Sequence, residues 1–225
     1  MTLRVSSARA YSVTSVTRVG SVGGEECGDT VSSFESCEDR AYALISDGMG
    51  KGRAAAFTSG VSSMFAKRML ESGNRAPTVI SMLNSFVRSK HEECSATVDL
   101  MELDLLTGKV DFYKCGAAAT YVKRRDNLFK LAAQTVPLGI LSATDTAKLS
   151  FDAEDGDVII MLSDGIAQGD EDAIWLFDVI TREWEDDADK MAKKIISAAR
   201  KHGSEDDASV ILTRVEKSEE VLPSL

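Results

Sequence analysis

Apolar and polar positions along this chain follow two different periods, and the change between them marks strands and helices. Short β-branched and apolar runs, bounded by glycine, aspartate or asparagine, predict strands. These runs cover residues 11–22, 31–35, 40–46, 97–106, 109–115, 120–124, 128–131, 148–151, 157–162 and 209–215. The turns at Thr107-Gly108 and at Arg125-Asp126-Asn127 predict two hairpins among them.

Apolar residues recur at helical spacing in two pairs of segments, over residues 54–70 and 78–90 and again over 171–182 and 189–201. Because the strands come in hairpins and the helices in pairs, a doubly wound parallel sheet is disfavoured. We predict an α+β fold, a central antiparallel β-sandwich flanked by helix pairs in four layers, α/β/β/α. No linker divides the chain, so we expect a single domain over residues 1–217 and a flexible tail over 218–225.

The acidic composition of the chain limits the kinds of molecule that it is expected to bind. The chain has 225 residues, of which 44% are hydrophobic, and a net charge of −10. Nucleic acids and anionic membranes require clustered lysine and arginine, so neither is expected as a partner. Solubility is the simplest explanation of the acidity, although aspartate clusters repel one another unless cations are present.

The cysteines and histidines argue against a zinc site. None of the four cysteines forms a Cys-x-x-Cys pair, and the chain has two histidines. Scattered cysteines of this kind are typical of a reducing cytosol, and Cys115 is expected to be a small core residue. The chain also lacks a signal-peptide pattern and an apolar run of about 18 residues. We therefore predict a cytoplasmic location.

Three acidic motifs carry the candidate chemistry. Asp47-Gly48 and Asp164-Gly165 each follow a predicted buried strand, and Asp206-Asp207 precedes the last one. Hard divalent cations such as Mg²⁺ and Mn²⁺ take oxygen ligands, and carboxylates at strand ends can converge on them. Each motif alone is also typical of a simple turn. Their shared position at strand ends favours a metal site, and both interpretations stay open at this point.

Two other kinds of site are excluded by spacing. The glycine-rich segment from Gly48 to Gly52 precedes a helix, but no Gly-Lys-Ser/Thr follows it as a Walker A loop requires. No Gly-x-Ser-x-Gly elbow is present, which argues against a serine hydrolase.

Taken together, five segments resemble the metal-dependent serine/threonine phosphatases of the PPM (type 2C) superfamily, and within it the bacterial branch typified by the stage II sporulation protein E phosphatase domain. In chain order they are Gly28-Asp29, Ile45-Ser46-Asp47-Gly48-Met49-Gly50-Lys51-Gly52, Pro137-Leu138-Gly139-Ile140, Met161-Leu162-Ser163-Asp164-Gly165 and Asp206-Asp207-Ala208-Ser209. The resemblance spans about Val13 to Val215 and implies the same sandwich between helix pairs.

The resemblance also implies roles for these residues. Asp47 would bridge two Mn²⁺ or Mg²⁺ ions and the Gly48 carbonyl would complete one of them, while Asp164 and Asp206 would hold the other. Asp47, Asp164 and Asp206 are thus the expected catalytic residues, in a reaction that forms no phosphoenzyme. Asp29 would contact the ions through metal-bound water, in the outer coordination shell. Asp207 would be a supporting residue of the metal site.

One departure concerns phosphate binding. Eukaryotic relatives use an arginine near the first motif, and residues 20–28 contain none. Arg18 lies nearby without matching the pattern, and Lys51 and Arg53 are better explained as a solvated helix start.

The resemblance implies a phosphoserine anti-anti-sigma protein as substrate, whose dephosphorylation would activate a sporulation sigma factor. It further implies a switch element and a homodimer surface in the helices at 54–70 and 78–90. Membrane attachment would occur only through a region outside this chain. Two alternatives remain, a catalytically silent regulatory domain and a stress-response phosphatase. The intact acidic residues favour the active enzyme.

Overall fold

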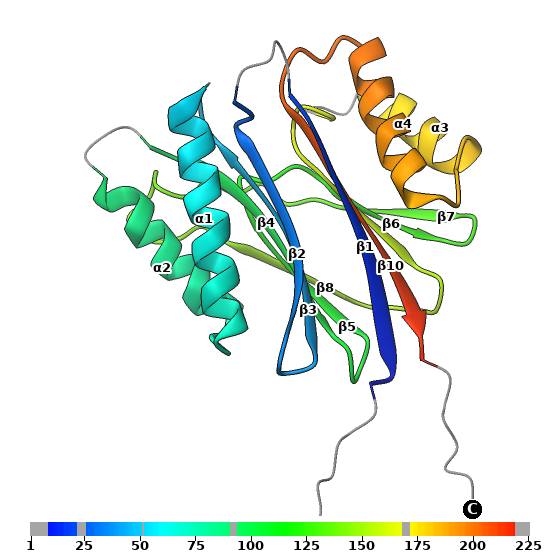
Figure 1. The fold of residues 1–225 in the computed structure, drawn as a ribbon, viewed down its shortest axis with the longest axis horizontal. Helices are drawn as coiled ribbons and strands as arrows, with labels where there is room; N and C mark the ends of the chain where they lie inside the picture. Colours follow the sequence, from blue (N-terminus) through cyan, green and yellow to red (C-terminus); the bar gives the residue numbers. More distant parts are fainter. Residues whose placement is uncertain (1–8, 22–25, 51, 91–93, 168–171, 219–225) are drawn as a thin grey trace, which may run out of the picture.

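The computed structural model describes residues 9–21, 26–50, 52–90, 94–167 and 172–218. Its strands form two antiparallel five-stranded sheets packed face to face (Figure 1). The first sheet has the order β1 (Tyr11–Gly20), β10 (Ala208–Lys217), β9 (Val158–Leu162), β6 (Thr120–Arg124) and β7 (Asn127–Leu131). The second has the order β2 (Asp29–Ser36), β3 (Arg40–Gly48), β4 (Ala96–Asp104), β5 (Lys109–Cys115) and β8 (Ala147–Asp152).

A helix pair covers the outer face of each sheet (Figure 1). The helices α1 (Arg53–Glu71) and α2 (Ala76–Ser89) pack on the β2–β8 sheet. The helices α3 (Asp172–Arg182) and α4 (Ala188–Lys201) pack on the β1–β7 sheet. The four predicted layers and both predicted hairpins are therefore confirmed.

Three apolar layers hold the sandwich together. The central layer lies between the sheets and includes Ile45, Phe112 and Met161, while the outer layers lie beneath each helix pair. A central strand such as β9 is consequently buried on both faces, which explains why it reads as a continuous apolar run rather than an alternating one. Cys115, at the end of β5, is fully buried in the layer below α1 and α2, as predicted.

One charged pair lies inside the central layer. The Lys114 ammonium donates hydrogen bonds to Asp99 Oδ2 at 2.6 Å, to Thr120 Oγ1 at 2.9 Å and to the Ala118 carbonyl at 2.7 Å. Lys114 and Asp99 belong to one sheet and Thr120 to the other. These contacts therefore join the two sheets where apolar packing alone would not specify their register.

The predicted boundaries needed correction near the acidic motifs. The prediction began β2 at Val31 and ended β3 at Ser46, whereas the paired strands run from Asp29 and to Gly48. The Gly48 amide also donates to the Gly28 carbonyl at 3.2 Å, which continues the ladder past the apolar run. The glycines over residues 23–29 predict a turn, but Asp29 already belongs to β2. Residues 23–25 of that segment, Lys51 and the tail from 219 onward lie outside the described residues.

No helix in the part of the chain that the structure describes is long and apolar enough to cross a lipid bilayer.

Candidate metal centre

The first half of the site is formed by β2 and β3. Asp29 lies directly opposite Asp47 in the register of these two strands. Opposed residues of antiparallel strands place their side chains on the same face of the sheet. Asp47 shares that face with Ile45, two residues earlier, which belongs to the layer between the sheets. Both carboxylates therefore lie at one end of the sandwich interior.

Gly48 brings the backbone of β3 against the start of α1. A Cβ atom at this position would lie 2.1 Å from the Ala55 carbonyl oxygen, so no larger residue fits. The Met49 amide, next in the chain, donates to the Ser95 carbonyl at 2.9 Å. The segment that carries Asp47 is thus held on both sides by backbone contacts.

Two loops of the other sheet form the second half. Asp164 follows β9, and Asp206 precedes β10. A Cβ atom on Gly165 would lie 1.8 Å from the Asp207 carbonyl oxygen, which shows how closely the two loops pack. Between their strands, the Ser209 amide donates to Ser163 Oγ at 2.8 Å. The antiparallel pairing of β9 and β10 therefore places Asp164 beside Asp206 and Asp207.

Asp207 connects the two halves. Its Oδ2 accepts a hydrogen bond from the Gly28 amide at 2.6 Å. A Cβ atom on Gly28 would lie 3.6 Å from Asp207 Oδ2 and also 3.6 Å from Asp47 Oδ1. The carboxylates of Asp47 and Asp207 thus approach the same glycine from opposite sheets.

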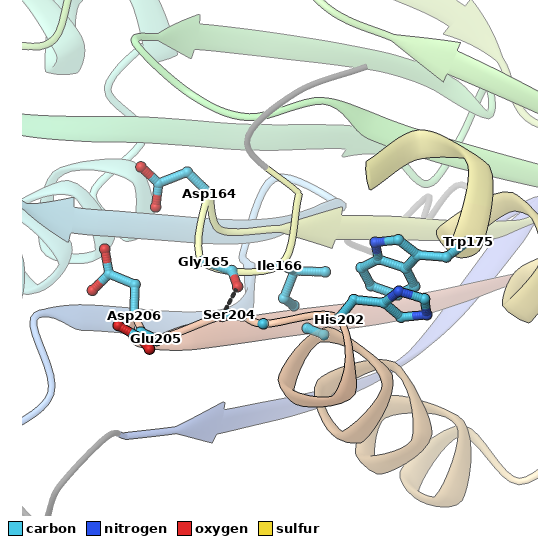
Figure 2. Close-up of a pocket in the computed structure, with 10 residues that line it drawn as sticks. Asp164, Gly165, Ile166, Trp175, His202, Ser204, Glu205 and Asp206 are labelled. Carbon is cyan, nitrogen blue, oxygen red and sulfur yellow. Dashed lines mark hydrogen bonds between the residues drawn. The ribbon is translucent and has the colours of Figure 1, made fainter. Parts of the chain in front are cut away.

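Arg200, in the last turn of α4, holds the Asp206 loop in place. Its guanidinium donates to the Gly20 carbonyl at 2.7 Å, to Ser204 Oγ at 3.1 Å and to the Asp206 carbonyl. The Ser204 hydroxyl in turn donates to the Gly165 carbonyl, as Figure 2 shows. Arg200 therefore links the end of β1 to the Asp206 loop, and Ser204 links that loop to the Asp164 loop.

Burial, together with the proximity of these acids to one another, raises their pKa values. Burial raises the pKa of Asp47 to about 8, and the negative charges of Asp29, Asp164 and Asp206 add to the rise. Burial also raises the pKa of Asp29 to about 6, with Asp164 adding to it and the hydroxyls of Ser209 and Ser163 opposing it. The pKa of Asp164 is raised too, by loss of surrounding water and then by the charge of Asp206.

The donor set fits a hard cation. The Asp29 Oδ2 atom is buried and has no hydrogen-bond partner in the structure. Among the described residues, no lysine or arginine pairs with Asp29, Asp47, Asp164 or Asp206. Carboxylate and carbonyl oxygens are the ligands of Mg²⁺ and Mn²⁺ rather than of zinc or copper. Within the same residues, no group of three or more histidine, cysteine, aspartate or glutamate side chains is placed to hold a metal ion.

All six residues expected at the site lie at this end of the sandwich. They are Asp29, Asp47, Gly48, Asp164, Asp206 and Asp207. Their individual roles as ligands stay predictions. Arg18 does not face the acids, since it pairs with Asp189 on α4. The Arg53 side chain is 91% exposed, as expected of a solvated helix start.

Several residues beside the site carry no sequence signal. Arg200 and Ser204 hydrogen-bond to backbone carbonyls, and such contacts leave no characteristic residue spacing in the sequence. An arginine in the last turn of a helix is also common, because the helix dipole favours positive charge there. A pocket next to Asp164 and Asp206 is lined by Trp175 and His202 (Figure 2). These two residues come from different helices, so only the folded chain brings them together.

Known proteins resemble this chain in sequence and in fold. Residues 38–216 match the family model of stage II sporulation protein E (SpoIIE). The chain is 30% identical over 220 residues to stage II sporulation protein E of Bacillus subtilis (strain 168), a match that covers 93% of this chain and 26% of that protein. It is 31% identical over 163 residues to the same protein of Priestia megaterium, covering 72% of this chain and 28% of that one.

A solved structure shares the fold. It contains the PP2C phosphatase domain of SpoIIE from Bacillus subtilis with a fragment of its regulatory domain. The match has a TM-score of 0.82 at 28% identity and covers 95% of this chain and 66% of that chain. Against the curated relatives, this chain spans about a quarter of their length.

Proposed function

The chain belongs to the stage II sporulation protein E family as a PPM-type phosphatase domain, and on that basis we propose that it removes phosphate from a phosphoserine protein in a reaction that requires Mn²⁺ or Mg²⁺. The observation that carries the proposal is the convergence of four aspartates from both sheets on one end of the sandwich.

Asp47, Asp164 and Asp206 would hold two ions, with the Gly48 carbonyl as a further ligand and Asp29 and Asp207 behind them. When bound, such ions neutralise the charge of the phosphate and lower the pKa of water to near neutrality. In their absence, burial and the charges of the neighbouring aspartates raise the pKa of Asp47. Protons would therefore compete with cations for this carboxylate.

The backbone around the acids determines their positions. The close approach of Gly48 to Ala55 and the contact of Gly165 with Asp207 leave little room for the loops to shift. Arg200 and Ser204 restrain the Asp206 loop through hydrogen bonds to backbone carbonyls. Ligands held by rigid strands and restrained loops lose less entropy when an ion or a phosphate binds.

For the substrate we propose a phosphoserine anti-anti-sigma protein, so that dephosphorylation would activate a sporulation sigma factor. Support comes from the family to which the chain belongs. The helices α1 and α2 are proposed as a switch element and homodimer surface, since α1 follows directly on the Asp47 loop. Attachment to a membrane would require a region outside this chain.

The test is release of phosphate from a phosphoserine anti-anti-sigma protein, followed with and without Mn²⁺. We expect Mn²⁺-dependent release from phosphoserine and much slower release from a phosphotyrosine version of the same site. The Asp206→Asn variant should bind the substrate without releasing phosphate. Binding without release by the unaltered chain would instead indicate a silent regulatory domain.

A further inference from the structure

A pocket of about 450 Å³ opens beside the acid cluster. Figure 2 shows the carboxylates of Asp164 and Asp206 on one side of it and the rings of Trp175 and His202 on the other. The reaction centre and the pocket therefore share a wall. Whatever occupies this pocket lies next to the phosphate that the site receives.

The far wall is aromatic. The rings of Trp175, on α3, and His202, at the end of α4, stack with centroids 5.0 Å apart and an angle of 8° between their planes. Trp175 also packs against the apolar layer beneath the helices, which holds the stack in place. Aromatic rings attract cations placed over their faces, and tryptophan does so most strongly.

The remaining charge of the pocket is negative. Glu205 lines it, is exposed to solvent and has no cationic partner among the described residues. It is not among the six residues expected at the metal centre, so bound ions would leave its charge free. No lysine or arginine of the described chain lines the pocket, and the guanidinium of Arg200 lies behind its wall, bound to Ser204 and to the Asp206 carbonyl. An acidic side chain beside an aromatic wall is complementary to a basic group.

We propose that this pocket accepts a lysine or arginine side chain of the substrate protein, from a position close to the phosphoserine. The inference rests on the proposed function, because it requires the phosphoserine to lie at the acid cluster. An extended residue spans roughly 3.5 Å, so a residue a few positions away reaches a pocket whose wall includes Asp164 and Asp206. A long basic side chain would lay its methylene groups along Ile166 and its charge between Glu205 and the aromatic stack.

The test measures binding rather than turnover. Fluorescent peptides carry a non-hydrolysable phosphonate analogue of phosphoserine, with lysine placed at one flanking position at a time on an alanine background. Their Kd values are measured by fluorescence polarisation in the presence of Mn²⁺. We expect lysine at one position to lower Kd roughly tenfold relative to alanine, and glutamate there to raise it.

Substitutions in the pocket test whether the preference for lysine arises there. Trp175→Leu and Glu205→Gln should each remove most of the preference for lysine. Glu205→Gln changes an exposed residue, so it tests the pocket even if Trp175→Leu fails to fold. The matched control is Trp184→Leu, because Trp184 also packs beneath α3 and α4 but lies outside the pocket, and it should keep the preference.

Two results would overturn the inference: Kd values that do not change along the lysine series, or a preference that persists in both pocket variants. Hydrolysis of p-nitrophenyl phosphate, which has no flanking residues, is measured in parallel. Its failure would count against the proposed function, whereas an unchanging peptide series beside normal hydrolysis would count against the pocket alone.

Discussion

The guanidinium of Arg200 donates a hydrogen bond to the backbone carbonyl of Asp206, the residue proposed to complete the second half of the metal centre. The same group also reaches the Gly20 carbonyl at 2.7 Å, at the end of β1. A helix end thereby fixes the loop that carries a proposed metal ligand.

Replacing Arg200 by lysine should weaken metal binding more than it weakens the fold. A lysine cannot reach Gly20, Ser204 and Asp206 together, because the planar fork of donors is lost. With hydrogen bonds to charged groups contributing about 1.5–3 kcal/mol each, we expect Mn²⁺ affinity to fall at least tenfold by isothermal titration calorimetry. Lys201→Ala, at the exposed neighbouring position, is the control. Equal affinities in both variants would show that Arg200 does not position the loop.

Gly48→Ala should destabilise the protein, whereas Gly60→Ala should not. The new methyl group at position 48 would lie 2.1 Å from the Ala55 carbonyl oxygen, and backbone cannot easily move away. We expect a loss of about 1–3 kcal/mol in urea unfolding. At Gly60, within α1, the nearest atom is Thr30 Oγ1 at 3.9 Å, so alanine should add about 0.5–1 kcal/mol. A Gly48→Ala variant as stable as the parent would contradict the packing of β3 against α1.

Lys114→Met alone should destabilise the protein more than the double variant in which Asp99 is replaced as well. The side chains of Lys114 and Asp99 are 0% and 2% exposed. The single change leaves a buried carboxylate without its cation and should cost about 3–5 kcal/mol in the free energy of unfolding. The double variant Lys114→Met with Asp99→Leu should recover most of this loss. If the double variant is no more stable than the single one, the ion pair is not the source of the effect.

The metal-free protein should become less stable as the pH rises from about 4 to about 8. Burial and the neighbouring negative charges raise the pKa of Asp47 to about 8 in the fold, against 3.8 for an ordinary aspartate. Between these values the folded state binds more protons than the unfolded one, so the free energy of unfolding falls with rising pH and levels off above the folded pKa.

Urea unfolding of EDTA-treated protein measures this slope. Asp47→Asn cannot titrate and should flatten most of it, while Asp126→Asn, in the exposed β6–β7 turn, should leave it unchanged. If the free energy of unfolding depends on pH equally in the parent and in Asp47→Asn, the titration of Asp47 is not the source of the pH dependence.

Most of the fold follows from local patterns in the sequence. Turn residues such as Gly108, whose φ is 77°, mark where strands reverse. The central strands were recognisable because burial on both faces makes them continuously apolar. The four layers then followed from the order of hairpins and helix pairs.

The site was only partly predictable. Asp47 and Asp164 stand out because each follows a buried strand. Asp29 has no such signal, since the glycines before it have no periodicity and its place opposite Asp47 depends on the register between two strands. The pairing of Trp175 with His202 depends on how α3 packs against α4. No spacing within a single segment carries that information.

The aspartates at this end of the sandwich are proposed to bind divalent cations for phosphate ester hydrolysis. Hydrolysis of p-nitrophenyl phosphate with and without millimolar Mn²⁺ tests this role, with Asp206→Asn as the control. We predict Mn²⁺-dependent turnover that the variant loses while it keeps its fold, because the change removes a ligand and no core volume. Turnover that is unaffected by EDTA or by Asp206→Asn would contradict the two-metal assignment.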